Sequence, residues 1–230
     1  MSAVRIETVD RTSGSTTSEQ VYLALREAIV SAELRPGLKL SENELGGELG
    51  VSRTPVREAL ARLRDERLVA IVPQLGTFVT LISPRAVGDA AFVREALECA
   101  AISRAVSRVD MEAVEELRWN LTAQDQARES GNERTFDRLD EDLHRRLCEY
   151  SGHAIAWALS RRANGHLDRI RRLSLPDPSY LSEMLSEHRQ IVDAVAEGDV
   201  PAAEDALRHH LRMVPSQLPR LQQQHPDYFE

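Results

Sequence analysis

The fold of the first part of this chain is decided by residues 49–60, which read LGVSRTPVREAL. Gly50 can end one helix in a left-handed conformation, and Ser52 is a residue type that caps the start of the next. A capping box, formed by Ser41 and Glu44, opens the short helix that precedes this turn. The following helix has apolar side chains at helical spacing: Val56, Ala59, Leu60 and Leu63. Residues 41–60 therefore predict a helix-turn-helix.

The segments on either side of this unit extend the pattern. Helical spacing of apolar residues from Ser18 predicts a helix that ends before the turn at Pro36 and Gly37. After Leu68 the pattern becomes strand-like over residues 69–72 and 77–81, with a Pro/Gly turn between them, which predicts a β-hairpin. Three helices followed by a hairpin indicate a winged helix-turn-helix over residues 18–82. Residues 1–17 are polar and aperiodic, and we expect them to be a flexible N-terminal arm.

Several polar residues of this predicted domain are placed where a DNA-reading helix needs them. Arg53 and Arg57 lie off the apolar face, at the helix end that reaches base edges. An arginine fork can bond two acceptors on guanine, while hydroxyls and helix N-terminal amides hold phosphates. The alternative is that these arginines only form a solvated helix face. The order of two capped helices followed by a hairpin argues against it. The predicted DNA-binding residues are Ser52, Arg53, Thr54 and Arg57 on the helix and Gly76 and Thr77 on the wing.

Composition limits the function classes. With 42% hydrophobic and 29% charged residues among 230, the chain can bury a core. The net charge is −8, and ten basic side chains nearly balance eleven acidic ones in residues 1–80, which excludes a strongly basic DNA-binding domain. No apolar stretch approaches the roughly 20 residues that cross a bilayer, and no leader is apparent, so we expect a cytoplasmic, nucleoid-associated bacterial protein with no membrane partner. Cys99 and Cys148 are too few for a disulfide framework.

Beyond a domain junction at Ser83 and Pro84, the sequence predicts only helices. The helical stretches lie near residues 85–108, 110–130, 133–150, 154–173, 179–197 and 200–214. Pro215 and Pro219 are expected to end the last helix. The predicted fold class is thus mostly α, with an all-α helical-bundle ligand- and metal-binding domain over residues 83–220 and a C-terminal tail over 221–230.

Four polar residues fall on apolar faces of these helices. Asp140 and His144 are four residues apart, so both project from one side of one helix. His188 and His210 lie within the apolar faces of the last two helices. Such side chains need partners when buried, and one divalent cation would satisfy all four. Hydrogen-bonded core histidines and a local Asp–His ion pair are the alternatives.

Arg94 also falls within an apolar stripe, that of the helix near 85–108. A buried guanidinium requires an anion. Glu98, one turn further on, is one candidate, and the carboxylate of a bound effector is the other. The roles of His153 and His166 stay open.

The quoted residues resemble the GntR family of bacterial transcription regulators. The resemblance rests on residues 36–42, on LGVSRTPVREAL and on the segment Gly76-Thr77-Phe78-Val79. The chain beyond Ser83 resembles the helical sensor domain of the FadR-type (FCD) subfamily. The resemblance implies operator contacts from the recognition helix and wing, and a metal held by Asp140, His144, His188 and His210. Asn43 departs from it, because many members carry arginine at that position.

These observations lead to one interpretation and two alternatives. We expect a homodimeric, sequence-specific repressor, not an enzyme, that binds double-stranded operator DNA. Its sensor domain is expected to hold a divalent transition metal, zinc or nickel, and a small organic acid that contacts Arg94 and changes operator affinity. A helical metal-dependent hydrolase is one alternative, although HExxH, a phosphate loop and a nucleophile elbow are lacking. A regulator that responds to the metal itself is the other.

Overall fold

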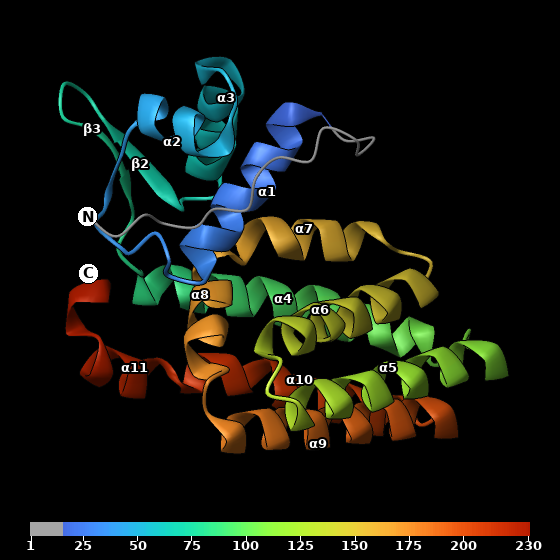
Figure 1. Cartoon of the computed structure of the whole chain (residues 1–230). Coiled ribbons are helices and arrows are strands. Elements are labelled where there is room, and N and C mark those ends of the chain that lie inside the picture. The colour runs from blue at the N-terminus through green and yellow to red at the C-terminus, as the bar shows by residue number, and fades with distance from the viewer. Residues whose placement is uncertain (1–15) are drawn as a thin grey trace. The chain divides into compact units, whose positions relative to one another are not determined.

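The computed structural model describes residues 16–230, which form two compact units. Residues 16–86 and 220–230 make up the first unit, and residues 87–219 make up the second. Each unit is described by itself. The prediction of a mostly α protein with a winged helix-turn-helix and a helical domain is confirmed (Figure 1). No helix within residues 16–230 combines the length and the apolarity that crossing a membrane would require.

The helices of the first unit begin and end at residues that suit those positions. They are α1 (Thr17–Val30), α2 (Glu42–Leu49) and α3 (Arg53–Asp65). The Ser41 hydroxyl accepts a hydrogen bond from the Glu44 amide at 3.4 Å, and Gly50 ends α2 with φ of 66°, as the sequence pattern requires. Ser52 occupies the cap position of α3, but its side chain makes no capping bond within the described part of the chain. Its exposed hydroxyl therefore remains available to a partner.

A small antiparallel sheet completes the first unit. Its strands are β1 (Lys39–Leu40), β2 (Val69–Val72) and β3 (Gly76–Val79), in the order β1-β3-β2. The β2–β3 hairpin matches the expected wing, whereas β1 was not predicted because two residues show no periodicity. Gly76 has φ of 123°, and a Cβ atom there would lie 2.9 Å from the Lys39 side chain. Glycine is therefore required where the hairpin begins β3.

The C-terminal residues also belong to a defined structure. Pro215 was expected to end the last helix, but α10 (Val200–Ser216) continues through it. Pro215 removes one hydrogen bond, the one its N–H would make to the carbonyl four residues earlier, and only Ser216 follows it in the helix. The chain then forms α11 (Leu218–Gln224) and a 3₁₀ turn, Pro226–Tyr228. Phe229 pairs with Ile82 in a short β-bridge, so residues far apart in sequence meet within the first unit.

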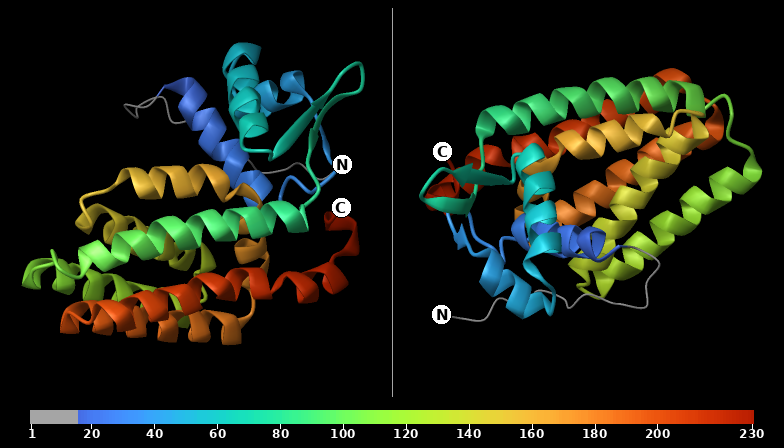
Figure 2. Two further views of the ribbon diagram at one scale, coloured as in Figure 1. Left: turned by 180° about the vertical axis from the view of Figure 1, so that it is seen from behind. Right: turned by 90° about the horizontal axis from the view of Figure 1, so that it is seen from above.

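The second unit is a helical bundle (Figure 2). Its elements are α4 (Pro84–Ala105), α5 (Met111–Glu129), α6 (Glu133–Tyr150), α7 (Ile155–Ala163), α8 (Gly165–Ser174), α9 (Pro178–Glu197) and α10. The single helix predicted over residues 154–173 was wrong in one respect, because the chain turns at Asn164 and divides it into α7 and α8. The local signal for this break is not the periodicity but the pair Asn164-Gly165, which is common in turns.

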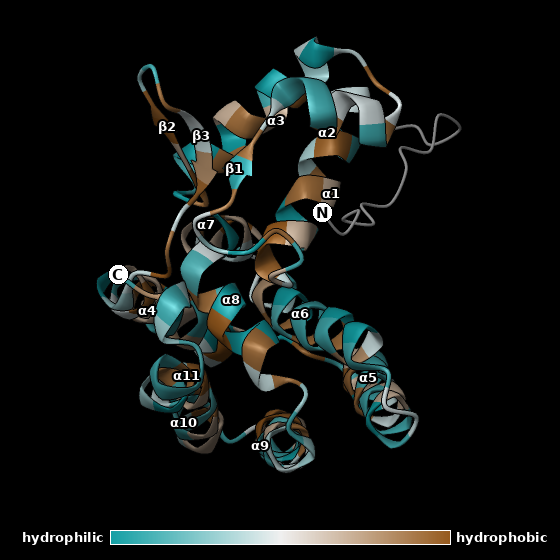
Figure 3. Ribbon diagram, turned by 60° about the vertical axis from the view of Figure 1, so that its left-hand side comes forward, coloured by the Kyte–Doolittle hydropathy of each residue, from teal (hydrophilic) through white to brown (hydrophobic). Residues whose placement is uncertain are grey.

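Packing within the bundle explains why polar residues are enclosed. Helix α5 packs against α6 and α9, and α9 packs against α10, around a continuous apolar core. Helix α8 runs steeply across one end of the bundle (Figures 1 and 3), and residues 165–171 are all buried. Charged side chains of α6, α8, α9 and α10 that face this core are consequently shielded from water.

Candidate functional site

The four predicted metal ligands meet at one point in the bundle. Asp140 and His144 come from α6, His188 from α9 and His210 from α10, and all four are buried. Their potential ligand atoms all lie within 4.8 Å of one another. The Nε2 atom of His210 is 3.1 Å from that of His144 and 3.2 Å from that of His188. Asp140 Oδ1 lies 3.3 Å from His188 Nε2 and 3.8 Å from His144 Nε2.

The hydrogen-bond partners of the Nδ1 atoms determine whether each Nε2 atom carries a proton or a free lone pair. His188 Nδ1 lies 2.7 Å from Gln124 Oε1, and His210 Nδ1 lies 2.9 Å from Glu187 Oε2. His144 Nδ1 is 2.7 Å from Glu98 Oε2, although off the line of an ideal hydrogen bond. Because Gln124 Oε1 and Glu187 Oε2 are acceptors, the Nδ1 atoms of His188 and His210 carry the proton and donate it. His144 Nδ1 faces a carboxylate oxygen, which favours the same tautomer. The three Nε2 atoms then present lone pairs to one another and to a carboxylate, an arrangement that a cation would stabilise.

The spacing of the ligand atoms fits a transition metal. Zinc–nitrogen bonds of about 2.0–2.1 Å in a tetrahedral arrangement separate ligand nitrogens by about 3.4 Å. Four of the six separations between ligand atoms, from 3.1 to 3.8 Å, bracket that value, and all six are within 4.8 Å. Three imidazoles and one carboxylate suit zinc or nickel, and hydrogen-bonded Nδ1 atoms are the usual support of metal-binding histidines.

Electrostatics favour the protonation states that a metal site needs. Burial lowers the pKa of His188 and His210, which keeps these imidazoles neutral. Burial alone would raise the pKa of Asp140, but the Arg171 guanidinium and the His188 hydrogen bond hold it well below its usual range. Arg171, on α8, contacts Asp140 Oδ2 and is itself fully enclosed. The site thus has an ionised carboxylate at Asp140 and uncharged rings at His188 and His210.

Arg94 lies on the inner face of α4, beside this centre. Its Nε atom donates to Glu98 Oε1 at 2.7 Å, so the nearby glutamate is its partner on one edge. Its Nη2 atom is buried and has no hydrogen-bond partner among residues 16–230. The same holds for the hydroxyl of Tyr180 on α9. Unsatisfied buried donors cost about 1–3 kcal/mol each, so both groups favour an added acceptor.

Sequence reasoning missed several residues of this centre. Glu98 was expected only as a partner of Arg94, and the supporting roles of Glu187, Gln124 and Arg171 were not predicted. The available signal was weak: on α5, the polar residues Asn120 and Gln124 stand four apart within the apolar stripe of Leu117 and Leu121. His166 is buried on α8, and His153 is exposed.

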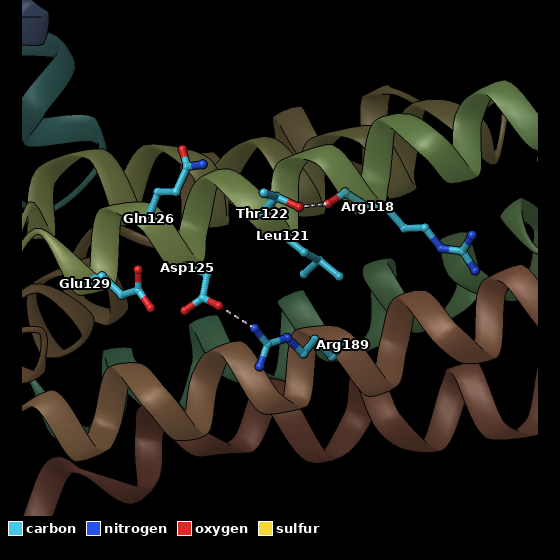
Figure 4. A pocket seen from close by; sticks show the side chains of 7 residues that line it. All are labelled: Arg118, Leu121, Thr122, Asp125, Gln126, Glu129 and Arg189. Atoms are coloured by element: carbon cyan, nitrogen blue, oxygen red, sulfur yellow. Dashed lines mark hydrogen bonds and ion pairs between the residues drawn. The ribbon is translucent and has the colours of Figure 1, made fainter.

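One surface hollow lies on the same helices but away from the metal centre. It has a volume of about 350 Å³ and lies along α5 and α9 (Figure 4). An ion pair of 2.7 Å between Asp125 and Arg189 crosses it. None of the four predicted metal ligands lines it.

The predicted DNA-reading residues lie on the surface of the first unit. The side chains of Arg53 and Arg57 are 59% and 65% exposed, and both bond to Glu42 at the start of α2. Ser52 and Thr54 are exposed beside them and line a hollow of about 700 Å³ with the N-terminal turn of α1. Gly76 and Thr77 are half-buried on the wing. The two arginines therefore project from one place at the N-terminus of α3.

Known proteins resemble both units. Residues 17–79 match the family described as bacterial regulatory proteins, gntR family, and residues 89–213 match the FCD domain. An HTH-type transcriptional regulator from an unstable DNA locus of Streptomyces ambofaciens is 43% identical over 95% of this chain and 92% of its own length. The HTH-type transcriptional repressor RspR of Escherichia coli is 33% identical over 92% and 93%. The structure of Escherichia coli McbR/YncC covers 92% of this chain and 99% of its own, with a TM-score of 0.77 and 22% identity, a likeness of fold alone.

Proposed function

Since this chain belongs to the GntR family of bacterial regulatory proteins with an FCD domain, and is a DNA-binding transcription regulator and not an enzyme, we propose how it recognises DNA and what it senses. In this proposal residues 18–82 bind operator DNA, and residues 83–220 bind a divalent metal and a small carboxylate effector that changes operator affinity. The protein acts at the nucleoid, where its operator is. The relative from Escherichia coli is named a repressor, which supports repression for this chain.

DNA recognition in this proposal depends on α3. Arg53 and Arg57 reach base edges in the major groove, and the hydroxyls of Ser52 and Thr54 hold phosphates. Gly76 and Thr77 place the wing against the backbone or minor groove. The exposure of both arginines at one helix terminus supports this assignment.

A homodimer would place two recognition helices on a two-fold symmetric operator. The outer faces of α4 and α7 support this proposal. These helices are neighbours, because the Ser160 hydroxyl of α7 donates to Glu98 of α4 at 3.2 Å. Together they expose an apolar surface that a second copy would cover: Phe92, Ala96, Ala100, Ile155 and Leu159.

The sensing proposal depends on one observation. The Nε2 atoms of three histidines and the Asp140 carboxylate converge beside the Arg94 guanidinium, whose Nη2 atom has no hydrogen-bond partner among residues 16–230. Bound there, a divalent metal would supply a Lewis acid to which a carboxylate can coordinate. Arg94 Nη2 would donate to the second oxygen of that carboxylate, with the Tyr180 hydroxyl as a further donor. A small organic acid is the class of molecule that satisfies both partners.

Helix α4 connects this site to the proposed dimer face. It carries Arg94 and Glu98 on its inner side and Phe92 on its outer side. An effector that binds Arg94 more tightly in one dimer arrangement than in another would shift the population of the two arrangements. Operator affinity would change with that population.

Two experiments test the proposal. In the first, the metal-loaded protein is screened by thermal shift with small organic acids, and a carboxylate hit that also changes an operator gel shift is expected. In the second, the gel shift is repeated after chelation and after re-addition of zinc. If metal alone controls operator binding and no acid acts, the protein is a metal-responsive regulator, the second candidate function.

A further inference from the structure

We propose that Gln124 fixes His188 as a metal ligand and, because it is an amide and not a carboxylate, keeps the centre able to accept an anionic effector. This inference rests on the metal and effector sites of the proposed function. It adds a positioning residue that also influences ligand specificity.

A continuous chain of hydrogen bonds leads from the centre through α5 to α6. His188 Nδ1 donates to Gln124 Oε1 at 2.7 Å, and Gln124 Nε2 donates to Asn120 Oδ1 at 2.7 Å. Asn120 Nδ2 then donates to the main-chain oxygen of Leu139 at 3.0 Å and to Asp142 Oδ2 at 3.1 Å. Asn120, Gln124 and His188 have no exposed surface.

The acceptors at the α6 end of this series of hydrogen bonds determine the orientation of every side chain in the series. A main-chain carbonyl and a carboxylate can only accept hydrogen bonds, so the Asn120 group that faces them is its NH₂. Asn120 Oδ1 therefore faces Gln124 and must accept from the Gln124 NH₂. That orientation leaves Gln124 Oε1 toward His188, which must carry its proton on Nδ1. His188 consequently presents an unprotonated Nε2 to the other ligands.

The three imidazole supports differ in charge. His144 and His210 have carboxylates, Glu98 and Glu187, at Nδ1, whereas His188 has a neutral amide. A third carboxylate here would add a negative charge one imidazole ring away from the ligand atoms. In a buried site such a charge repels an anion strongly enough to lower its affinity by at least about tenfold. The amide positions the ring without adding this repulsion.

Two substitutions at Gln124 separate the two roles. Q124L removes the acceptor, and loss of such a support typically lowers metal affinity by about 10–100-fold. Q124E retains the acceptor for His188 Nδ1 but loses the NH₂ that donates to Asn120 Oδ1, so its metal affinity should lie well above that of Q124L and within about tenfold of wild type, while anion affinity falls by at least about tenfold. Q126E is the matched control, since Gln126 is exposed two residues further along α5 (Figure 4).

The experiment uses the full-length chain. Zinc affinity is measured by competition with a chromophoric chelator, and acetate is titrated into the cobalt-substituted protein while the visible Co²⁺ absorption is recorded. Circular dichroism checks the fold of Q124L, and Q124E provides the test if Q124L does not fold. The expected result is weak zinc binding by Q124L, a wild-type-like Co²⁺ spectrum but weak acetate response for Q124E, and unchanged behaviour for Q126E.

Failure of the inference and failure of the proposed function give different results. If wild type binds zinc and acetate but Q124L binds zinc equally well, or Q124E responds to acetate as wild type does, the role assigned to Gln124 is overturned. If the wild-type protein itself binds no zinc or cobalt, the proposed metal site fails and the inference fails with it. If wild type binds metal but not acetate, the carboxylate part of both proposals is overturned.

Discussion

Replacement of His210 by alanine tests the metal centre most directly. His210 is the ligand whose Nε2 lies closest to those of the other two histidines, at 3.1 and 3.2 Å. Its neighbour His209 is 76% exposed and is not one of the four predicted ligands, although its ring lies 3.2 Å from Glu187 Oε1. H209A is therefore a control for loss of a histidine on the same helix that leaves the bond between His210 and Glu187 in place. For each variant the Tm with metal is compared with the Tm without metal, so that the effect of the deleted ring on packing cancels.

The expected size of the effect follows from binding linkage. At a free zinc concentration of about 100 times Kd, binding to the folded state alone stabilises the protein by about 2.7 kcal/mol. For a chain of roughly 150–250 residues, this raises Tm by about 5–11 °C. Loss of one of four ligands should weaken zinc binding by at least about 100-fold, which reduces the metal-dependent increase to about 1–2 °C.

The assay is thermal unfolding of chelated and zinc-loaded protein, followed by circular dichroism, with elemental analysis of zinc after gel filtration. Wild type and H209A should show the full increase and retain zinc, whereas H210A should show neither. Full zinc content in H210A would refute the ligand set. A loss of zinc in H209A equal to that in H210A would show that the loss does not report on the buried cluster.

Three further results are expected. R57A should weaken operator binding by roughly 5–150-fold in a gel shift because it removes a proposed base contact, while R64A on the same helix should change it little; equal effects would argue against base reading by α3. F92D should convert a dimer to a monomer in light scattering, because Phe92 is 75% exposed on the proposed dimer face; an unchanged mass would move the interface elsewhere. Burial raises the pKa of Cys148 to about 12 and of Cys99 to about 11, so both thiols stay protonated at pH 8. Both should therefore react with a thiol reagent only after unfolding, and rapid labelling of the folded protein would contradict their burial.

Prediction from sequence succeeded where the signal was local. Gly50 and Ser41 define the helix-turn-helix because cap geometry depends on residues within one helical turn. The i, i+4 spacing of Asp140 and His144 likewise identified one side of α6. The strand β1 could not be predicted, because tertiary contacts, and not periodicity, stabilise it. The division of α7 from α8 falls at Asn164-Gly165, a local turn signal that periodicity alone does not show.

The sequence by itself determined the order of the longer helices and of the hairpin, the exposed arginines of α3 and the four side chains able to bind a metal, since helical spacing assigns each residue to a face. Only the tertiary structure decided that those four faces meet. It also decided which groups hold them: Gln124 and Arg171 come from helices packed against the ligand helices, at 64 and 31 residues from the side chains they support. Hydrogen-bond partners so distant in sequence are chosen by helix packing, and a single sequence carries no local signal for that choice.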